Sequence, residues 1–319
     1  MNPNNRKNKE RHEDRVLHFT NRGAEERKLM EFTDECLTDA KRNDLKKWLR
    51  FGHLAVDGRV KTAFDAPVPP GSEVTLNLTR PFPVFHHPRI ELLYEDDDVL
   101  VIHKGYGMLS VGTKGRTDMP SMKKQENAYD ILRSYVKKSD PRNKLWVVHR
   151  LDRHTSGLMM FAKSERAHDV LRHNWNNIIL ERLYVAVLEG YLEEDKGYVK
   201  SWLTENSQFV VYSTDVPGEG KLAVTHYEVI GRGNNYTLVH FSLDTGRKNQ
   251  IRVHSSDLGH PIAGDRKYGA KTSPINRLAL HAQTLRFAHP ITKKDMNFQS
   301  PVPRDFYGAI GKRHKGLQK

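Results

Sequence analysis

Two periodicities of apolar residues divide the chain into helix-like and strand-like segments. Helical spacing predicts helices at residues 42–50, 126–138, 164–175 and 250–258. Short apolar runs bounded by turn residues predict strands at 74–76, 99–102, 145–148, 158–161, 183–188, 199–203, 209–212, 223–230 and 236–243. Strands this close together, joined by short turns, favour antiparallel pairing. The expected fold class is α+β, with a mixed, mostly antiparallel central sheet and flanking helices.

A compact pattern near the N-terminus predicts a small separate domain. Leu45, Trp48 and Leu49 share one face of the first predicted helix, and Gly52 suits its C-cap. Asp57-Gly58 lies between two short strands, which is typical of a hairpin. A proline-glycine turn then leads into a further strand.

A basic stripe lies on another face of the same helix. It consists of Arg42, Lys46 and Arg50, at positions i, i+4 and i+8. Such a stripe is usually only a solvated face, but helix, hairpin and turn together resemble the RNA-binding domain named after ribosomal protein S4. Lys41-Arg42 replaces the usual Ser-Arg start of the basic helix. The resemblance implies that the stripe contacts RNA.

Changes in composition suggest the domain boundaries. Residues 1–22 are polar and charged and are expected to form a basic disordered arm. The S4-like domain is assigned to 23–80, and three prolines make 81–90 a stiff linker. The largest domain is expected at 91–306, followed by a basic tail at 307–319.

Charge and cysteine content narrow the class of protein. The net charge is +13, which attracts polyanions and makes nucleic acid the leading partner class, although a merely basic soluble protein has the same composition. The single cysteine, Cys36, excludes internal disulfides and cysteine metal clusters. No apolar run has the length of a membrane span, and the N-terminus does not resemble a signal peptide. A soluble cytoplasmic protein, without membrane contact and monomeric, is expected.

Cofactor and metal motifs are incomplete in this sequence. Gly105-Tyr106-Gly107 begins like a dinucleotide-binding loop, but Ser110 stands where the third glycine is required and no helix follows. The histidines, among them His149, His254 and His281, match no zinc spacing. We therefore expect no cofactor and no metal, and we expect these histidines to be structural or to contact RNA.

The polar segment HRLDRHTSGL, residues 149–158, separates two apolar strands. Asp152 lies between arginines within it, which suits a catalytic carboxylate. Asp, Thr, Ser and Gly are also common turn residues, so the segment by itself is equally compatible with an ordinary turn. The flanking residues do not decide between the two interpretations.

Five motifs in order resemble those of the RluA-like pseudouridine synthases. They are HRLDRHTSGL, RLYVAVLEG, TGRKNQIRVH, GHPIAGDRKYG and RLALHAQTLRFAHP, within residues 91–306. The resemblance implies the pseudouridine synthase fold and the isomerisation of a uridine in RNA without a metal or an organic cofactor. An N-terminal S4-like domain is common in this family.

The resemblance also implies roles for four residues. Asp152 matches the essential carboxylate, Arg252 the arginine that pairs with it, and Tyr184 the active-site tyrosine. Arg150 matches the arginine that helps to fill the space left by the flipped base. Residues 155–157 are expected to shape the loop.

Two departures from the family pattern are expected to affect loop shape and RNA choice only. Asn249 stands where the family usually has histidine, and Gly105 follows Lys104 where proline is usual. Neither is expected to contact Asp152, Tyr184 or Arg252. The substrate remains open between large-subunit ribosomal RNA, which the RNA-binding domain favours, and transfer RNA. An RNA-binding protein of the same fold without catalysis is the further alternative.

Overall fold

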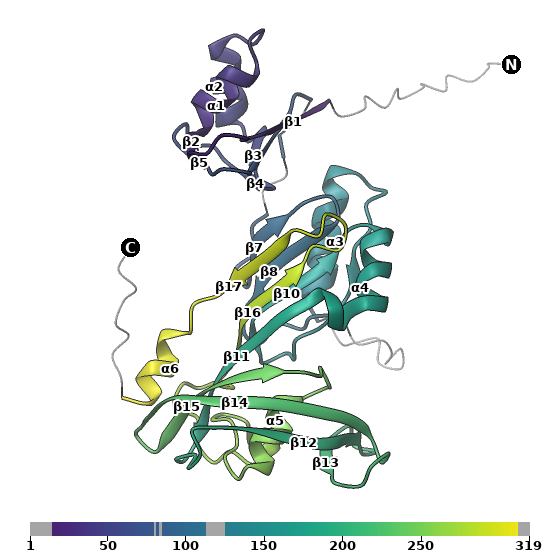
Figure 1. Ribbon diagram of the computed structural model, residues 1–319, viewed down its shortest axis with the longest axis vertical. Coiled ribbons are helices and arrows are strands. Elements are labelled where there is room, and N and C mark those ends of the chain that lie inside the picture. Colours follow the sequence, from purple (N-terminus) through teal and green to yellow (C-terminus); the bar gives the residue numbers. More distant parts are fainter. Residues whose placement is uncertain (1–14, 80, 83–84, 113–124, 312–319) are drawn as a thin grey trace, which may run out of the picture. The chain divides into compact units, whose positions relative to one another are not determined.

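The computed structural model describes residues 15–79, 81–82, 85–112 and 125–311 (Figure 1). The chain divides into two compact units. The first contains the residues up to Phe85 together with Tyr94–Asp96, and the second contains His86–Leu93 and the residues from Asp97 onward.

The first unit combines two helices with a four-stranded antiparallel sheet of order β1-β6-β3-β4. Its helices are α1 (Leu29–Cys36) and α2 (Arg42–Arg50). The sheet consists of β1 (Val16–Thr20), β3 (Leu54–Val56), β4 (Arg59–Val60) and β6 (Glu73–Asn77), and β2 (Arg27–Lys28) pairs with β5 (Pro67–Val68). Buried apolar side chains of both helices and of the sheet form one core.

The helix and hairpin predicted from the sequence are both present in this unit. Leu45 and Leu49 are buried, and Gly52 follows α2 with a φ of 77°. Asp57 and Gly58 connect β3 to β4, both with positive φ, as the tight hairpin turn requires. The local sequence therefore encodes these elements.

The predicted N-terminal arm is wrong over residues 16–20. This segment is strand β1, which pairs with β6 from Val16 opposite Asn77 to Thr20 opposite Glu73. Leu17 and Phe19 pack against the core of the first unit. Three of the five residues of this strand are apolar, so the polar character of residues 1–22 as a whole does not hold for it. Residues 1–14 of the predicted arm lie outside the described residues.

The second unit is built on an eleven-stranded sheet. Nine strands follow the order β13-β12-β14-β15-β11-β16-β10-β8-β7, while β17 pairs with β16 and β9 with β10. The strands are β7 (Ile90–Glu95), β8 (Val99–Lys104), β9 (Trp146–Val147), β10 (Ser156–Ala162), β11 (Ile179–Glu189), β12 (Lys196–Glu205), β13 (Val211–Thr214), β14 (Lys221–Gly233), β15 (Tyr236–Leu243), β16 (Leu280–Ala288) and β17 (Asp295–Gln299). All these pairings are antiparallel except that of β10 with β16, as the expected mixed sheet requires.

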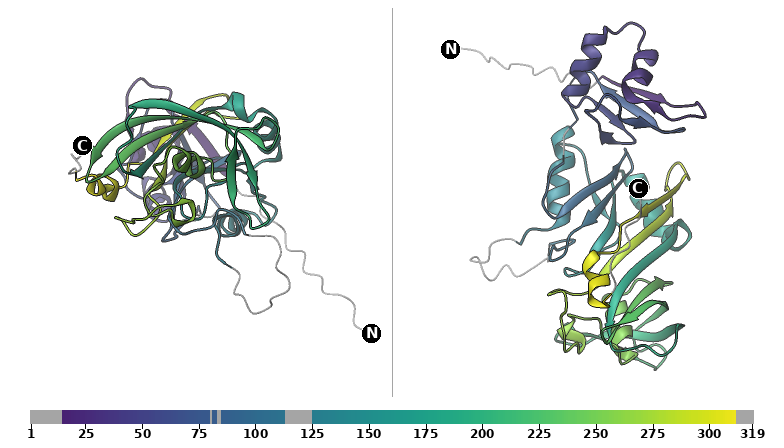
Figure 2. Two further views of the ribbon diagram at one scale, coloured as in Figure 1. Left: turned by 90° about the horizontal axis from the view of Figure 1, so that it is seen from below. Right: turned by 90° about the vertical axis from the view of Figure 1, so that its left-hand side faces the viewer.

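Helices cover parts of this sheet. They are α3 (Ala128–Ser139), α4 (Glu165–Ile178), α5 (Gln250–Asp257), the 3₁₀ turn Arg266–Tyr268 and α6 (Arg304–Ala309). Helix α4 packs against β9, β10 and β11, and α5 against β13 and β14. Figure 2 shows the long strands of the β12–β15 half curving over α5.

Two boundaries of the second unit differ from the prediction. Helix α6 extends to Ala309, so the tail does not begin at residue 307. The side chain of Phe306 is buried in the core and anchors this helix, while residues 312–319 lie outside the described range. Strand β7 begins at Ile90, the last residue of the segment predicted as a linker. The side chain of Ile90 is buried, so this residue belongs to the folded unit.

Gly157 permits the one parallel contact of the sheet, between β10 and β16. Its φ is +117°, and an added Cβ would lie 2.2 Å from the carbonyl oxygen of Ala282. Only glycine allows this approach. The glycine expected to shape the loop therefore brings β10, which begins at Ser156 shortly after Asp152, against β16.

Candidate active site

The segment that carries Asp152 connects β9 to β10. The N–H of Thr155 donates to the carbonyl oxygen of Asp152 at 3.1 Å and closes a turn. Asp152 is partly buried and lines a cavity of about 60 Å³ together with Arg150, Thr155, Tyr184, Arg247 and Arg252. The structure thus brings together in one cavity the four residues for which the family resemblance implied roles: Arg150, Asp152, Tyr184 and Arg252.

Arg252 lies on α5 and is shared between two carboxylates. Its Nη1 lies 3.5 Å from Oδ2 of Asp152. Its Nε and Nη2 donate to the two carboxylate oxygens of Asp265, each at 2.7 Å. Burial disfavours the charged form, but the hydrogen bonds and charge of Asp265, and then the charge of Asp152, raise the pKa of Arg252. The guanidinium stays positive beside Asp152.

Asp265 is the strongest partner of Arg252, and its role was not predicted. Its side chain is 2% exposed and that of Arg252 12% exposed, so the pair is shielded from solvent. The ring of Tyr268 lies 4.8 Å from the guanidinium carbon of Arg252. Asp265 belongs to GHPIAGDRKYG, one of the five family motifs. An acidic residue within a family motif was the sequence signal that could have indicated its role.

The expectation that Asn249 contacts none of the three central residues is wrong. Its Oδ1 accepts a hydrogen bond from Nη1 of Arg252 at 3.1 Å. Asn249 has a φ of 56° and precedes α5, and its Nδ2 donates to the hydroxyl of Tyr268. Asparagine tolerates this left-handed backbone, and its amide helps to orient the guanidinium.

Tyr184 forms another wall of the cavity, from β11. It pairs with Phe241 on β15 and with Ala282 on β16, in the middle of the sheet. Burial raises the pKa of its phenol, the charge of Arg182 lowers it, and the charge of Asp152 raises it further, with a net upward shift. Tyr184 is therefore a neutral phenol that can donate a proton or present its ring face.

Two residues that sequence reasoning missed hold the Asp152 segment in place. The hydroxyl of Ser110 donates to the carbonyl oxygen of Leu151 at 2.6 Å and accepts the N–H of Leu151 at 3.1 Å. Nζ of Lys104 donates to the carbonyl oxygens of Gly105, Met108 and Arg153. Ser110, the residue that breaks the apparent dinucleotide motif, thus fixes the residue before Asp152.

Lys104 is fully buried at the end of β8. Burial lowers its pKa to about 7, while the negative charge of Asp152 acts in the opposite direction. Two signals in the sequence pointed to it: a polar residue ends an apolar strand, and Lys104 matches the lysine of the family's usual Lys-Pro pair. Lys104 holds the turn after Asp152 through the carbonyl oxygen of Arg153, and its protonated form adds positive charge near the Asp152 carboxylate.

The buried histidines have structural partners. The N–H of Met160 donates to His149, His254 lies between the hydroxyls of Ser201 and Thr225, and His281 lies between those of Ser156 and Ser300. Burial lowers the pKa of His149 and of His281 to about 3 and that of His254 to about 4. All three are neutral near pH 7. Over the described ranges, no group of three His, Cys, Asp or Glu side chains has metal-binding geometry.

The predicted basic stripe lies in the first unit, whereas Asp152 lies in the second. Arg42, Lys46 and Arg50 are exposed on α2, whereas Leu45 and Leu49 on the same helix are buried. The guanidinium of Arg50 lies 5.8 Å from the exposed ring of Phe51. The stripe is available to a ligand.

Known proteins resemble this chain over most of its length. A sequence profile described as RNA pseudouridylate synthase matches residues 98–257. The uncharacterized RNA pseudouridine synthase YlyB of Bacillus subtilis is 34% identical, over 85% of this chain and 89% of its own length. The ribosomal large subunit pseudouridine synthase D of Pasteurella multocida is 30% identical, over 86% of this chain and 88% of its own length.

A solved structure shares the fold. Human RNA Pseudouridylate Synthase Domain Containing 4 superposes with a TM-score of 0.54 at 23% identity, over 69% of this chain and 91% of that chain. In the part of the chain that the structure describes, no helix is long and apolar enough to cross a membrane. The α+β pseudouridine synthase fold predicted from the motifs is confirmed. The chain belongs to the RNA pseudouridylate synthase family and is an RNA pseudouridine synthase.

Proposed function

We propose that Asp152 is the catalytic carboxylate and that the substrate is a uridine in large-subunit ribosomal RNA. The observation that carries the proposal is the contact of Asp152 with Arg252 in a cavity that Tyr184 also lines. Two relatives, from Pasteurella multocida and Vibrio cholerae, are named ribosomal large subunit pseudouridine synthase D, which supports the choice of RNA. Action on ribosomal RNA would place the protein in the cytoplasm.

The arrangement suits the isomerisation of uridine. The bond from C1′ to N1 breaks and a bond from C1′ to C5 forms. C5 loses its proton and N1 gains one, so the composition of the nucleotide is unchanged. An ionised carboxylate can act on the sugar or on the base and then accept or relay a proton. Arg252 stabilises the ionised form of Asp152, since an opposite charge nearby favours it. The neutral phenol of Tyr184 supplies a face for the base and a proton donor.

Base flipping explains the position of Arg150. A uridine stacked in RNA must leave its stack before it can enter the cavity. Arg150 is exposed and lines the same cavity as Asp152. It is therefore placed to occupy the space that the flipped base leaves.

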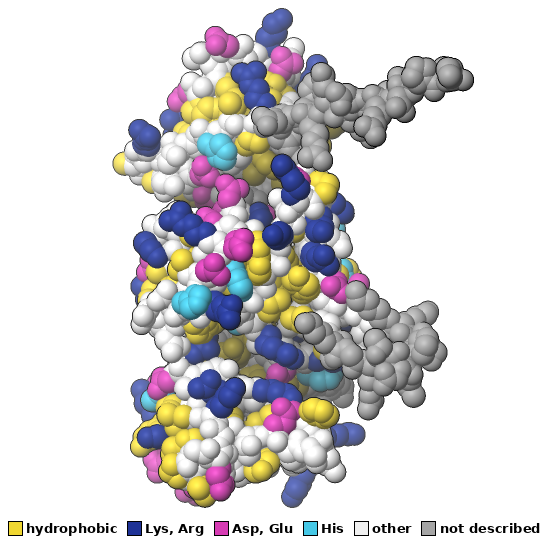
Figure 3. All heavy atoms as spheres, turned by 90° about the vertical axis from the view of Figure 1, so that its right-hand side faces the viewer, with side chains coloured by type: hydrophobic (Ala, Val, Ile, Leu, Met, Phe, Trp, Pro, Cys, Tyr) yellow, Lys and Arg dark blue, Asp and Glu magenta, His cyan; other side chains and the backbone are white. Residues whose placement is uncertain are grey.

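The surface charge fits an RNA substrate. On the face drawn in Figure 3, lysine and arginine side chains are spread over both units among acidic ones. The net charge of +13 supports binding to the phosphate backbone. Exposed Arg42, Lys46 and Arg50 in the first unit are proposed to add to this binding.

The decisive experiment combines an Asp152→Asn variant with pseudouridine mapping. Cells lacking the protein receive either the wild-type gene or the variant, and ribosomal and transfer RNA are mapped. We expect one or more sites in large-subunit RNA to depend on the wild-type protein and to be lost with the variant, while the purified variant still binds RNA. Modification by the variant would refute the role of Asp152. Dependent sites in transfer RNA alone would refute the choice of substrate, and no dependent site would favour a catalytically silent RNA-binding protein.

A further inference from the structure

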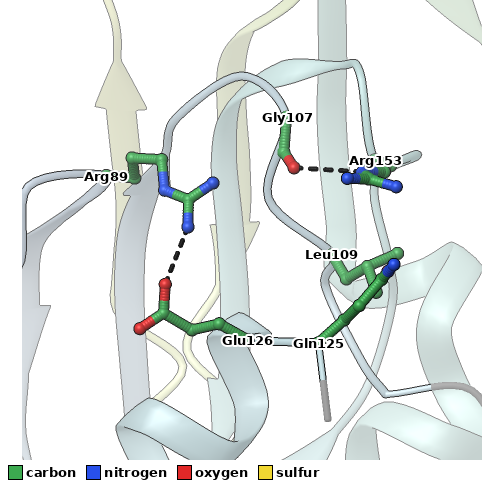
Figure 4. Close-up of a pocket in the computed structure, with 6 residues that line it drawn as sticks. All are labelled: Arg89, Gly107, Leu109, Gln125, Glu126 and Arg153. Atoms are coloured by element: carbon green, nitrogen blue, oxygen red, sulfur yellow. Dashed lines mark hydrogen bonds and ion pairs between the residues drawn. The ribbon is translucent and has the colours of Figure 1, made fainter. Parts of the chain in front are cut away.

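A second cavity adjoins the residue that follows Asp152. Its volume is about 140 Å³, and it is lined by Arg89, Gly107, Leu109, Gln125, Glu126 and Arg153. None of these residues lines the cavity that contains Asp152. Figure 4 shows Arg89 and Glu126 on one side of the space and Arg153, Leu109 and Gln125 on the other.

The polar groups of this cavity offer both donors and an acceptor. Nη2 of Arg89 donates to Oε2 of Glu126 at 2.7 Å, and Nε2 of His87 lies 3.3 Å from Oε1. Nε of Arg153 donates to the carbonyl oxygen of Gly107 at 3.2 Å, which fixes the orientation of its guanidinium. The hydrogen bond from Arg89, followed by that from His87, lowers the pKa of Glu126. The cavity thus presents a charged acceptor opposite a charged donor.

Gly105, which stands where the family usually has proline, positions Arg89. The N–H of Gly105 donates to the carbonyl oxygen of Arg89 at 2.7 Å. An added Cβ on Gly105 would lie 3.0 Å from that oxygen and 3.2 Å from Cα of Arg89. A proline here would have no N–H to donate. Gly105, where the sequence departs from Lys-Pro, therefore holds the segment that carries Arg89 against the loop after β8.

The same dipeptide also positions Arg153. Nζ of Lys104 donates to the carbonyl oxygen of Arg153 at 3.4 Å, and Gly105 follows directly. Both arginines of the cavity are thus placed by Lys104-Gly105. Because Arg153 follows Asp152 directly in the chain, the cavity adjoins the segment that carries the proposed catalytic carboxylate.

The size and chemistry of the cavity suit a single nucleobase. Its volume is roughly ten times what one water needs by the same measure. Proteins read RNA sequence mainly in unpaired segments, where splayed bases are hydrogen-bonded on their edges. Glu126 can accept from a base N–H, and Arg153 can donate to a base oxygen or ring nitrogen. All four bases carry such a donor and such an acceptor on their edges.

We propose that this cavity binds one unpaired base of the substrate RNA near the target uridine, through a base N–H donated to Glu126 and a base acceptor atom that accepts from Arg153. This inference rests on the proposed RNA substrate. The site anchors one unpaired nucleotide of the RNA, whichever of the four bases it carries.

The test uses the full-length protein and the RNA identified by mapping. Each unpaired nucleotide near the target is replaced in turn by an abasic one, and steady-state kinetics are measured for the wild type and for Glu126→Ala. Asp295→Ala is the matched control, because Asp295 forms a comparable exposed pair with Arg286 on β16 and β17. A second variant, Gln125→Trp, fills the cavity from an exposed position.

We expect an abasic nucleotide at one position to raise the KM of the wild type roughly tenfold with little change in kcat. Glu126→Ala and Gln125→Trp should raise the KM for the parent RNA similarly. They should add little for the abasic RNA, since both changes remove the same interaction. Asp295→Ala should behave like the wild type. If both cavity variants keep the wild-type KM for every RNA, the inference is wrong although the proposed function stands. If the wild type modifies no RNA, both are wrong.

Discussion

Replacing Asp265 with asparagine tests whether the buried tether of Arg252 supports both the fold and catalysis. Asp265 accepts two hydrogen bonds of 2.7 Å from Arg252, and the exposed fractions of the two side chains are only 2% and 12%. Removing one partner of a buried ion pair costs about 3–5 kcal/mol, because it leaves an uncompensated charge. Asparagine keeps one carbonyl oxygen, so about 3 kcal/mol is expected.

This loss should be visible in thermal unfolding. For a domain of this size, each 1 kcal/mol lowers Tm by roughly 2–4 °C, so Asp265→Asn should lower the Tm of the second unit by roughly 6–12 °C. Asp295→Asn is the control. Asp295 also binds an arginine, Arg286, through both oxygens, but the side chains of Asp295 and Arg286 are 51% and 45% exposed. An exposed pair contributes about 0–1 kcal/mol, so Tm should hardly change.

Catalysis should respond to the same substitution. Without the Asp265 carboxylate, Nη1 of Arg252 is no longer held toward Asp152, and a displacement of about 1 Å can cost about a hundredfold in rate. We expect kcat to fall roughly ten- to a hundredfold, at a temperature where the variant is folded, with little change in KM for RNA. Calorimetry and single-turnover pseudouridine formation measure the two effects. Equal Tm changes in Asp265→Asn and Asp295→Asn, or an unchanged kcat, would refute this reasoning.

Two further predictions concern pH and salt. Burial lowers the pKa of His254 to about 4. The unfolded chain, whose histidine titrates near 6.5, therefore binds a proton that the folded chain does not between pH 6.5 and 4. The stability contributed by neutral His254 is complete above about pH 6.5 and is lost as the pH falls through this window. Urea unfolding measured across the window should show a shallower decline of the free energy of unfolding for His254→Gln than for the wild type. An identical decline would exclude His254 as a source of the pH dependence. Changing Arg42, Lys46 and Arg50 together to glutamine should weaken RNA binding and reduce the slope of log K against log salt by up to about three. An unchanged slope in filter binding would show that the stripe is only a solvated surface.

Local elements could be predicted from the sequence because local residues encode them. Helix α4 begins where expected, since the hydroxyl of Ser164 accepts the N–H of Ala167. Helix α3 buries Leu132, Tyr135 and Val136 at the predicted spacing. The hairpin at Asp57-Gly58 follows from two residues that tolerate positive φ. Each signal lies within one turn of the element that it specifies.

Elements that depend on distant partners could not be predicted. Strand β1 carries Val16, Leu17 and Phe19, but this short apolar run stands between polar segments, and it is ordered by pairing with β6. Strand β17 follows the same rule, since its burial alternates only between exposed and partly buried positions and its order comes from pairing with β16. Propensity within a short window does not report such pairing.

The candidate site shows the same division. By its motifs, the sequence alone determined the family, the reaction and the identities of Asp152, Tyr184 and Arg252 as candidates. Only the tertiary structure decided that Ser110 brackets Leu151, that Lys104 supports the turn beside it, and that Asp265 and Asn249 orient Arg252. Motifs record which residue types chemistry requires. The contacts that hold those residues at reacting distance join segments far apart in sequence, so they exist only once β8, β10 and α5 have packed into one unit.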